Sequence, residues 1–445
     1  MKKKVGIPQE FVEFTTTNEG VIPMKKRIYR TMSVNAFQPC TVRREDVGGR
    51  LVVAVDIAKV DMVAAFAAAD GRILTTVRWK APTENTMLLS VLRQFRAAEM
   101  VVEVVMEPSG SYGDVLRNQL QADGFPVFMV SGKRTFDARE VYDGVPSLHD
   151  AKSAAIIAKL HFDGISKRFV PPAPERRQLR AAITIMDLHQ QRYLQLVGHL
   201  EGLLARHWPE LPSILELTSA SLMALLARIG GPADVAVERD RAARLLHGQS
   251  HGLMDRGNIT AVLDSAASSV GLPLVGLERD ALMATAAEAH RSLRAFKVAK
   301  TTVEKLSQTT PATALAPVVG QATAAVVLSD VGDARSFPCT AAYLKAMGLN
   351  LKEKSSGTLK GQLKLTKRGS SRVRQYLWLA VYRWIQKDAI ANRWYQHKKQ
   401  RDGGRSSRAA VALMRKLAKA LFHVARGAVF DSSKLFDVRR LGLPA

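Results

Sequence analysis

Three acidic residues, each at the border of an apolar or helical segment, are the strongest candidates for chemistry in this sequence. Asp56 ends an apolar run within VVAVDIAKVD (52–61), Glu107 follows the run VVEVVM (101–106), and Asp150 opens the pattern HDAKSAAIIAKL. Divalent cations prefer anionic oxygen ligands, and two such ions can stabilise the attacking and leaving oxygens of a phosphodiester. Each acid could instead form a turn, end a strand or cap a helix.

The elements around these acids predict a sheet covered by helices. Apolar runs separated by turn signals predict strands, among them a hairpin at Asp70-Gly71, and helical spacing predicts helices between the later strands. The expected strands are 51–57, 61–69, 72–79, 101–106 and 125–130, and the expected helices are 83–100, 112–124 and 150–164. This order predicts a mixed ribonuclease H-like sheet, in which strands 51–57 and 101–106 are neighbours and Asp56 and Glu107 share one edge.

The rest of the chain predicts an α/β protein with a large helical part. We expect a flexible basic arm at 1–50, a catalytic domain at 51–170, a helical region at 171–310 and a basic, mostly helical domain at 311–445. Within the helical region, residues 175–207 and 276–308 have the pattern of an antiparallel coiled coil or helical stalk, with an insertion at 209–275.

The charge balance indicates a polyanionic partner. The 445 residues contain 65 Lys and Arg against 40 Asp and Glu, a net charge of +25, and residues 351–445 alone contain 23 basic against 5 acidic residues. Nucleic acid is the expected partner, and a membrane surface is the alternative. The residues expected to contact nucleic acid are Lys364, Lys367, Arg368, Arg372, Arg374, Lys398, Lys399 and Arg401.

Several other classes of protein are disfavoured. No long apolar run or signal-like start is present, so we expect a cytosolic protein that works at the nucleoid without a membrane partner. Two distant cysteines support neither a disulfide framework nor a cysteine-rich zinc site. The phosphate-loop pattern G-x-x-x-x-G-K-S/T is absent, so any reaction on a nucleic-acid partner would have to proceed without nucleotide hydrolysis.

Two blocks of the sequence resemble one family. VDIAKVD, VVMEPSGSYGDVL and HDAKSAAIIAKL are similar to the acidic segments of the DEDD transposases of the IS110 insertion-sequence family. Residues 316–380, which include SSGTLKG, are similar to the C-terminal transposase domain of that family. The resemblance covers roughly residues 50–165 and 310–385, in the family's order.

The resemblance implies a site-specific DNA recombinase with a RuvC-like domain, a coiled coil and a nucleophilic serine. Ser356 is the serine that matches, and Ser355 is the reserve. A serine that attacks a phosphodiester forms a phosphoserine, which retains the energy of the broken bond. The family implies Mg²⁺, with Mn²⁺ as a substitute, held by Asp56, Glu107 and Asp150. It also implies a structured bridge RNA as guide, DNA at the element ends and the target, and a dimer or tetramer.

One position departs from the family pattern. The family has a second Asp one helical turn after the third acid, and Ser153 stands there in this sequence. Asp143 could substitute, His149 could add a nitrogen ligand, or three carboxylates and water could suffice. Two other functions therefore stay open. One is a junction-resolving, structure-specific nuclease that uses water as the nucleophile, and the other is a nucleic-acid-binding protein without catalysis.

Overall fold

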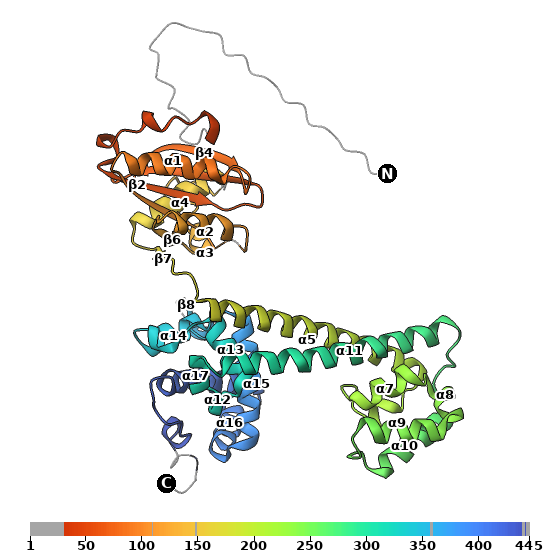
Figure 1. Ribbon diagram of the computed structural model, residues 1–445. Coiled ribbons are helices and arrows are strands. Elements are labelled where there is room, and N and C mark those ends of the chain that lie inside the picture. Colours follow the sequence, from red (N-terminus) through yellow and green to blue (C-terminus); the bar gives the residue numbers. More distant parts are fainter. Residues whose placement is uncertain (1–30, 109, 147–148, 357–358, 438–440, 442–445) are drawn as a thin grey trace. The chain divides into compact units, whose positions relative to one another are not determined.

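The chain forms two compact units, which we describe separately. The computed structural model describes residues 31–437 and 441 except 109, 147–148 and 357–358, with the side chains of 354–360 and 362 also outside the description (Figure 1). The first unit ends at Pro171 and the second begins at Pro172. Asp56, Glu107 and Asp150 lie in the first unit, and Ser356 lies in the second.

A seven-stranded mixed sheet organises the first unit, in the order β1-β4-β3-β2-β5-β6-β7. Its strands are β1 (Thr31–Ser33), β2 (Arg50–Asp56), β3 (Asp61–Ala68), β4 (Ile73–Lys80), β5 (Val101–Met106), β6 (Val127–Met129) and β7 (Lys167–Arg168). Strands β2, β3 and β4 form an antiparallel meander with a turn at Asp70-Gly71, where Gly71 has a φ of +84°. Strand β2 then pairs in parallel with β5, so the predicted meander and the predicted neighbouring strands are both confirmed.

Helices cover both faces of this sheet, which explains why β2 is apolar at nearly every position. The helices are α1 (Asn85–Ala97), α2 (Asp114–Ala122), α3 (Gly132–Asp137) and α4 (Asp150–Phe162). On one face Leu92 of α1 packs with Val53, and on the other Ile157 of α4 packs with Val52. A strand buried on both faces has no solvent side for polar residues. The mixed sheet with helices is consistent with a ribonuclease H-like domain.

A buried polar contact fixes the C-terminal end of α4 on the sheet. The Nε2 atom of His161 lies 2.9 Å from Oε2 of Glu103 in β5, and the Arg50 guanidinium donates to the same oxygen at 2.7 Å. Because α4 is held at this end and packs on β2 along its length, its N-terminus takes a defined place at the edge of the sheet.

Regular structure begins earlier than the sequence predicted. Strand β1 pairs with β4, and short 3₁₀ turns connect it to β2, so residues 31–50 belong to the folded unit and the arm expected at 1–50 is too long. Val34, Phe37 and Val47 are the reason, because they are buried in the core, where the rings of Phe37 and Phe66 lie 5.1 Å apart. Residues 1–30 lie outside the described part of the chain.

Two long helices dominate the second unit. Helices α5 (Pro174–His207) and α11 (Leu277–Ser307) lie side by side and antiparallel, with Arg206 paired to Glu278 and Arg192 to Glu288 (Figure 1). The expected helical stalk is therefore present, whereas its coiled-coil supercoil stays a prediction. Between the two helices, a small bundle has its own core around Trp208 and Leu226. It contains α6 (Leu211–Ile214), α7 (Ala220–Arg228), α8 (Pro232–Val237), α9 (Arg239–Gln249) and α10 (Arg256–Ala267).

The C-terminal helices share a core with the base of this stalk. Leu179 and Ile183 of α5 and Val303 of α11 are buried in the same cluster as the later helices, so the boundary expected near residue 310 lies within one continuous core. The later helices are α12 (Ala316–Val319), α13 (Gln321–Asp330), α14 (Thr340–Ala346), α15 (Ser371–Lys387), α16 (Ala389–Arg401) and α17 (Ser406–Val424). No described helix combines the length and the apolar character needed to cross a membrane.

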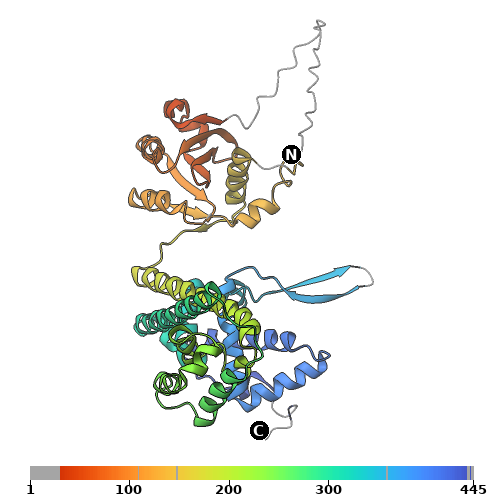
Figure 2. The same cartoon turned by 90° about the vertical axis from the view of Figure 1, so that its right-hand side faces the viewer.

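A two-stranded ribbon leaves this helical body, which the expectation of a mostly helical domain did not include. Strands β8 (Leu351–Ser356) and β9 (Leu359–Leu365) pair antiparallel and project away from the helices (Figure 2). Apolar and polar residues alternate over most of LKGQLKL in β9, whereas only the first residue of LKEKSS in β8 is apolar. This period of two is typical of a hairpin. The candidate serine stands at the end of its first strand.

Candidate active site

Asp56 and Glu107 lie next to each other at the carboxyl ends of two neighbouring parallel strands. Asp56 is the last residue of β2, and Glu107 directly follows β5. The strands are in register at Val55 and Met106, so the next residue of each strand carries one of the two acids. Both side chains are partly buried. The predicted pairing of β2 with β5 therefore sets Asp56 and Glu107 at one edge of the sheet, and their role as metal ligands stays a prediction.

Asp150 reaches the same edge from the N-terminus of α4. It is the first residue of the helix, and His149 is its N-cap, with a side chain that accepts a hydrogen bond from the Lys152 amide at 3.3 Å. The alternative role of Asp150 as the N-cap residue is therefore excluded. Helix α4 packs on β2 and β3, which carries its first turn over the end of β2. Asp150 itself is exposed.

The pKa of Asp56 reports how these carboxylates act on one another. Burial, followed by the negative charges of Glu107 and Asp150, raises the pKa of Asp56 from 3.8 to about 7, although a hydrogen bond from the Ile57 amide opposes the shift. Like charges disfavour ionisation of a neighbour when they are close. The three acids predicted from the sequence therefore form one electrostatic group.

Gly132, which the sequence pattern did not single out, makes room for Glu107. A Cβ atom on Gly132, the first residue of α3, would lie 2.6 Å from Oε2 of Glu107. Only glycine therefore permits the observed position of this carboxylate. The signal in the sequence was the pair Ser131-Gly132 directly after the apolar run 125–130, but such a pair is also common in plain turns.

The residues considered for the fourth acidic position have other contacts. Asp143 accepts from the ammonium of the buried Lys152 at 2.8 Å and from the Val145 amide, and its ion pair with Lys152 lowers its pKa. This pairing argues against Asp143 as a substitute ligand. Ser153 is partly buried one turn along α4 from Asp150, in the register that the family pattern gives to the missing Asp.

The carboxylates of Asp56, Glu107 and Asp150 are suitable ligands for a hard divalent cation. In this structure, however, their oxygens do not lie close enough together to share one. Burial and the repulsion among the three carboxylates raise the pKa of Asp56, and a shared positive charge would favour its ionised form. Among the described residues, however, no three His, Cys, Asp or Glu side chains are close enough together to hold a metal ion. A metal centre at this edge therefore requires side-chain rotation of the acids.

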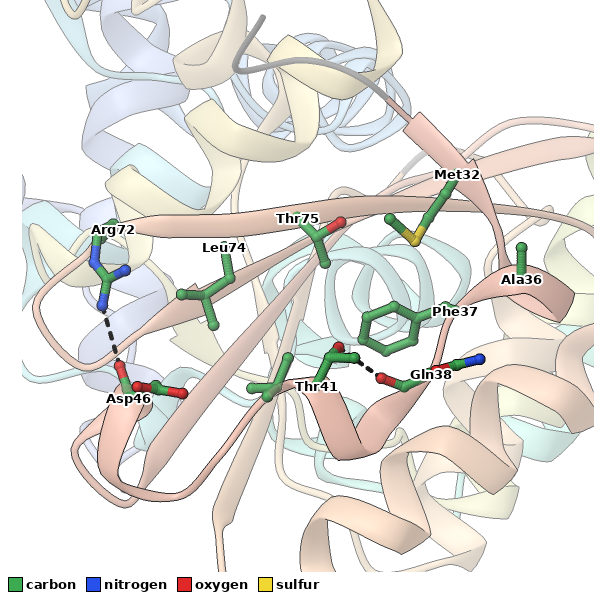
Figure 3. A pocket seen from close by; sticks show the side chains of 10 residues that line it. Met32, Ala36, Phe37, Gln38, Thr41, Asp46, Arg72, Leu74 and Thr75 are labelled. Carbon is green, nitrogen blue, oxygen red and sulfur yellow. Dashed lines mark hydrogen bonds between the residues drawn. The ribbon is translucent and has the colours of Figure 1, made fainter. Parts of the chain in front are cut away.

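The first unit also has a hollow, which lies at the end of the strands opposite to the acidic edge. It has a volume of about 550 Å³, and Met32, Phe37, Leu74 and Thr75 point into it (Figure 3). Leu74 and Thr75 lie near the beginning of β4, whereas the acids lie where β4 ends, because β2 and β4 run in the same direction. This hollow is therefore separate from the acidic edge.

Ser356 is the last residue of β8 and pairs with Leu359 across the tip of the ribbon. The side chains of Ser355 and Ser356 lie outside the described part of the structure, so only their backbone positions are known. The structure describes the ribbon and the acidic edge in separate units. Because β8 ends at Ser356, the serine stands at the outer end of this strand, and the ribbon projects away from the helices (Figure 2).

The basic residues expected to contact nucleic acid divide into three groups. Lys364, Lys367 and Lys398 line one groove at the base of the ribbon. The second group is Arg368, Lys399 and Arg401, on the β9–α15 loop and on α16 outside that groove. The third group is Arg372 and Arg374, whose guanidinium groups contact the protein itself.

The expectation for Arg372 is corrected by its surroundings. Its Nε atom lies 3.2 Å from Asp187 of α5 and 3.6 Å from Asp330 of α13, and only 27% of its side chain is exposed. Because two carboxylates already neutralise this guanidinium, it links α15 to α5 and α13 and is not available to bind phosphate. Arg374 donates to the carbonyls of Gly369 and Ser370, which stabilises the loop before α15.

Comparisons with known proteins agree with this arrangement. A family model of the DEDD transposase type of IS110 elements, described as a transposase, matches residues 53–209. A second family model, described as transposase IS116/IS110/IS902 family, matches residues 315–396. The chain is 24% identical over 368 residues to an insertion element IS110 uncharacterized 43.6 kDa protein from Streptomyces coelicolor, which covers 80% of this chain and 89% of the relative. The two matched regions contain the acidic edge and the ribbon, respectively.

Proposed function

Because the chain belongs to the IS110 family of transposases, we propose that it moves its insertion sequence as a site-specific recombinase with a phosphoserine intermediate at Ser356. The family supports a DNA-cutting and DNA-rejoining enzyme, and the proposal adds the residues and the chemistry. The observation that carries it is the electrostatic effect of Glu107 and Asp150 on Asp56, at the end of the neighbouring strands β2 and β5.

The three acids are the residues that would hold a divalent cation, and we propose Mg²⁺, with Mn²⁺ as a substitute. A bound divalent cation stabilises the negative charge that develops on a reacting phosphodiester. The protein's own part is positional. The sheet sets Asp56 beside Glu107, the first turn of α4 brings Asp150 above them, and Gly132 leaves the space that the Glu107 carboxylate occupies.

The serine would conserve bond energy through covalent catalysis. The Ser356 oxygen forms a bond to phosphorus and gives up its proton, while the bond to one deoxyribose oxygen breaks and that oxygen takes up a proton. The reverse reaction with a different deoxyribose hydroxyl joins the strand to a new partner and frees the serine. No nucleotide hydrolysis is needed, which agrees with a sequence that lacks a phosphate loop.

The proposal includes three kinds of partner. The strongly basic C-terminal region supports binding to DNA at the element ends and at the target, and to a structured guide RNA. We propose a dimer or tetramer, in which a ribbon from one subunit could meet an acidic edge from another. A composite site of this kind would prevent single subunits from cutting DNA at random.

The test is to trap a covalent adduct between the full chain and a suicide DNA substrate in the presence of Mg²⁺ and the element's noncoding RNA. We expect a protein–DNA species that resists denaturation and disappears in Ser356→Ala, with Ser355→Ala as the matched control that retains it. Asp56→Ala and Glu107→Ala should also abolish the adduct while nucleic-acid affinity stays nearly the same.

Each alternative function has its own outcome in this assay. Cleavage without an adduct, undiminished in Ser356→Ala, would identify a water-dependent nuclease and contradict the serine assignment. Binding without cleavage or adduct, even with Mn²⁺, would leave only a nucleic-acid-binding protein. Cleavage that survives Asp56→Ala would reject the acidic edge as the metal site.

A further inference from the structure

A groove at the base of the β8–β9 ribbon is lined by cationic side chains, most of them exposed, and by partly buried apolar side chains. We call the cationic part its rim and the apolar part its floor. Its volume is about 780 Å³, and residues from β8, from β9 and the loop after it, and from α16 and α17 line it. The rim carries Lys352, Lys364 and Lys367 from the ribbon side and Arg408 and Arg415 from α17. Three of these five cations, Lys352, Arg408 and Arg415, were not among the contacts that the sequence suggested.

Among the described residues, most of these cations form no ion pair, although the charge of Arg408 helps to lower the pKa of Asp402, which also lines the groove. Lys398, which also lines the groove, is neutralised by Asp402 at 2.7 Å. In the part of the chain that the structure describes, no carboxylate forms an ion pair with Lys352, Lys364, Lys367 or Arg408, all of which are exposed. Arg415 is partly buried and donates its Nε hydrogen to the Leu349 carbonyl, which orients the rest of its guanidinium.

The pairing of the ribbon gives an independent indication of an anionic ligand. Lys352 of β8 and Lys364 of β9 are directly opposite each other in the antiparallel register. Like charges at such a position destabilise a strand pair, and a two-stranded ribbon without a covering layer is marginal in water. An anion between the two lysines would turn this repulsion into a stabilising contact. The ribbon therefore has a reason to be more stable with its ligand than without it.

The floor and the size of the groove restrict which polyanion fits. The floor includes Leu365, Val411 and Ala412, all partly buried. Pockets of this volume hold ligands the size of about one or two nucleotides. In a duplex the base faces are stacked away from a protein surface, whereas an unstacked base can cover an apolar floor while its phosphates meet the cations.

From these observations we propose that the groove binds an unpaired segment of DNA, with phosphates on the cationic rim and one base against the apolar floor. The inference rests on the proposed function, because the ribbon that forms one wall ends at Ser356. If a DNA strand is held at the base of the ribbon, the nucleotide that reaches Ser356 lies a fixed number of positions away along that strand. The groove would thus act in strand positioning, and its residues need not touch the reacting phosphate.

The experiment measures how the affinity of the full chain for DNA depends on salt. Fluorescence anisotropy follows a labelled single-stranded oligodeoxynucleotide, its annealed duplex and the RNA of the same sequence, in EDTA so that no cleavage occurs. The test variant is Lys364→Gln combined with Arg408→Gln. The matched control is Lys297→Gln combined with Lys305→Gln, which removes two exposed cations from α11, outside the groove.

The expected result is a selective decrease in salt dependence. Each phosphate of a single strand that the protein no longer neutralises lowers the slope of log affinity against log salt by about 0.7, so the test variant should lower it by about 1.4. The duplex slope and the control variant should change little. If circular dichroism shows that the test variant misfolds, Lys352→Gln alone, at an exposed ribbon position, should lower the slope by about 0.7.

Three outcomes would overturn the proposal. An unchanged single-strand slope would remove the groove as a binding site, an equal or larger decrease on the duplex would contradict its preference for unpaired DNA, and a decrease confined to RNA would assign it to a different ligand. Because the measurement needs neither metal nor cleavage, its failure is distinguishable from a failure to form the Ser356 adduct.

Discussion

The ionised form of Asp56 opposes folding of the metal-free protein. Its pKa is raised from 3.8 to about 7 by burial and by the charges of Glu107 and Asp150, so the folded state prefers the protonated form. An acid whose pKa is raised on folding costs nothing below its unfolded pKa, because it is neutral in both states. The cost appears as the pH rises through the interval from about 4 to 7 and is complete above it.

Asp56→Asn should therefore stabilise the metal-free protein in a pH-dependent way. Asn keeps the shape and can still accept from the Ile57 amide, while the charge is removed. We expect a gain of about 1–3 kcal/mol in the free energy of unfolding at pH 8, after allowance for partial solvent screening, and a gain that falls toward zero near pH 4. Urea denaturation in EDTA at several pH values measures it.

The control for this prediction is Asp61→Asn, which removes an exposed carboxylate at the start of β3. It should show no comparable gain. An equal stabilisation by Asp56→Asn at pH 4 and pH 8 would mean that shape, not charge, is responsible, and would contradict the electrostatic grouping of the three acids.

Gly132 offers a way to move Glu107 without removing it. In Gly132→Ala the new Cβ would lie 2.6 Å from Oε2 of Glu107, and the flexible carboxylate must give way. Because misplacement of a catalytic group by about 1 Å can cost roughly 100-fold in rate, we expect a loss of that order in strand cleavage. The stability should change by less than about 1 kcal/mol.

The matched control is Gly198→Ala on α5, where an added Cβ would meet no atom within 4 Å. Cleavage by this variant should be unchanged. If Gly132→Ala cleaves as fast as the original protein, the position of the Glu107 carboxylate against Gly132 is not the one used in catalysis.

At the scale of elements, one ion-pair network joins three helices beneath the ribbon. Arg372 of α15 contacts Asp187 of α5 and Asp330 of α13, and the Tyr376 hydroxyl donates to Asp187 at 3.0 Å. Ser370, the N-cap of α15, donates to Asp330 at 2.6 Å. Because β9 leads into this cap, the network fixes the place from which the ribbon leaves the helices.

Arg372→Met should destabilise the second unit. The substitution leaves two largely buried carboxylates without their cation, which typically costs about 3 kcal/mol or more. The control is Arg335→Met, whose partner Asp333 forms a more exposed pair and whose removal should cost less than about 1 kcal/mol. Thermal or urea unfolding of the two variants compares them, and equal costs would show that the network contributes no more stability than an exposed ion pair.

At the scale of the whole molecule, the chain is divided between two units with separate cores. The sheet of the first unit buries its strands under α1 and α4, whereas the second unit is built around the stalk and the C-terminal helices. The division lies at Pro171 and Pro172, within the proline-containing stretch VPPAP. Units with their own cores can unfold separately when few contacts join them.

Calorimetry should therefore resolve two unfolding transitions. We expect Asp56→Asn at pH 8 to raise the midpoint of one transition and Arg372→Met to lower the midpoint of the other, because each residue belongs to a different unit. The double variant should combine the two shifts, since distant sites act independently. A single transition shifted by both substitutions would show that the units fold as one.

The sequence by itself determined the central strands of the first unit and the place of the acids at their ends. Apolar runs bounded by turn residues marked β2, β3, β4 and β5, and the turn at Asp70-Gly71 predicted the hairpin of β3 and β4. Once β2 and β5 were expected as neighbours, the shared edge of Asp56 and Glu107 followed, because each acid stands at the end of an apolar run. Strands, turns and the residues at strand ends depend on residues close together in the chain, so the local pattern of apolar and turn-forming residues predicts them.

Only the tertiary structure decided which polar groups meet. It turned Arg372 toward Asp187 and Asp330, paired Asp143 with Lys152, and set Gly132 against Glu107. It also joined the base of the ribbon to α16 and α17 to make the groove. The physical reason is that the partner of a charge is chosen by position in space, and residues that are not neighbours in the chain leave no periodic signal of that choice. The net charge indicated a polyanion, and the fold decided which cations remain free for it.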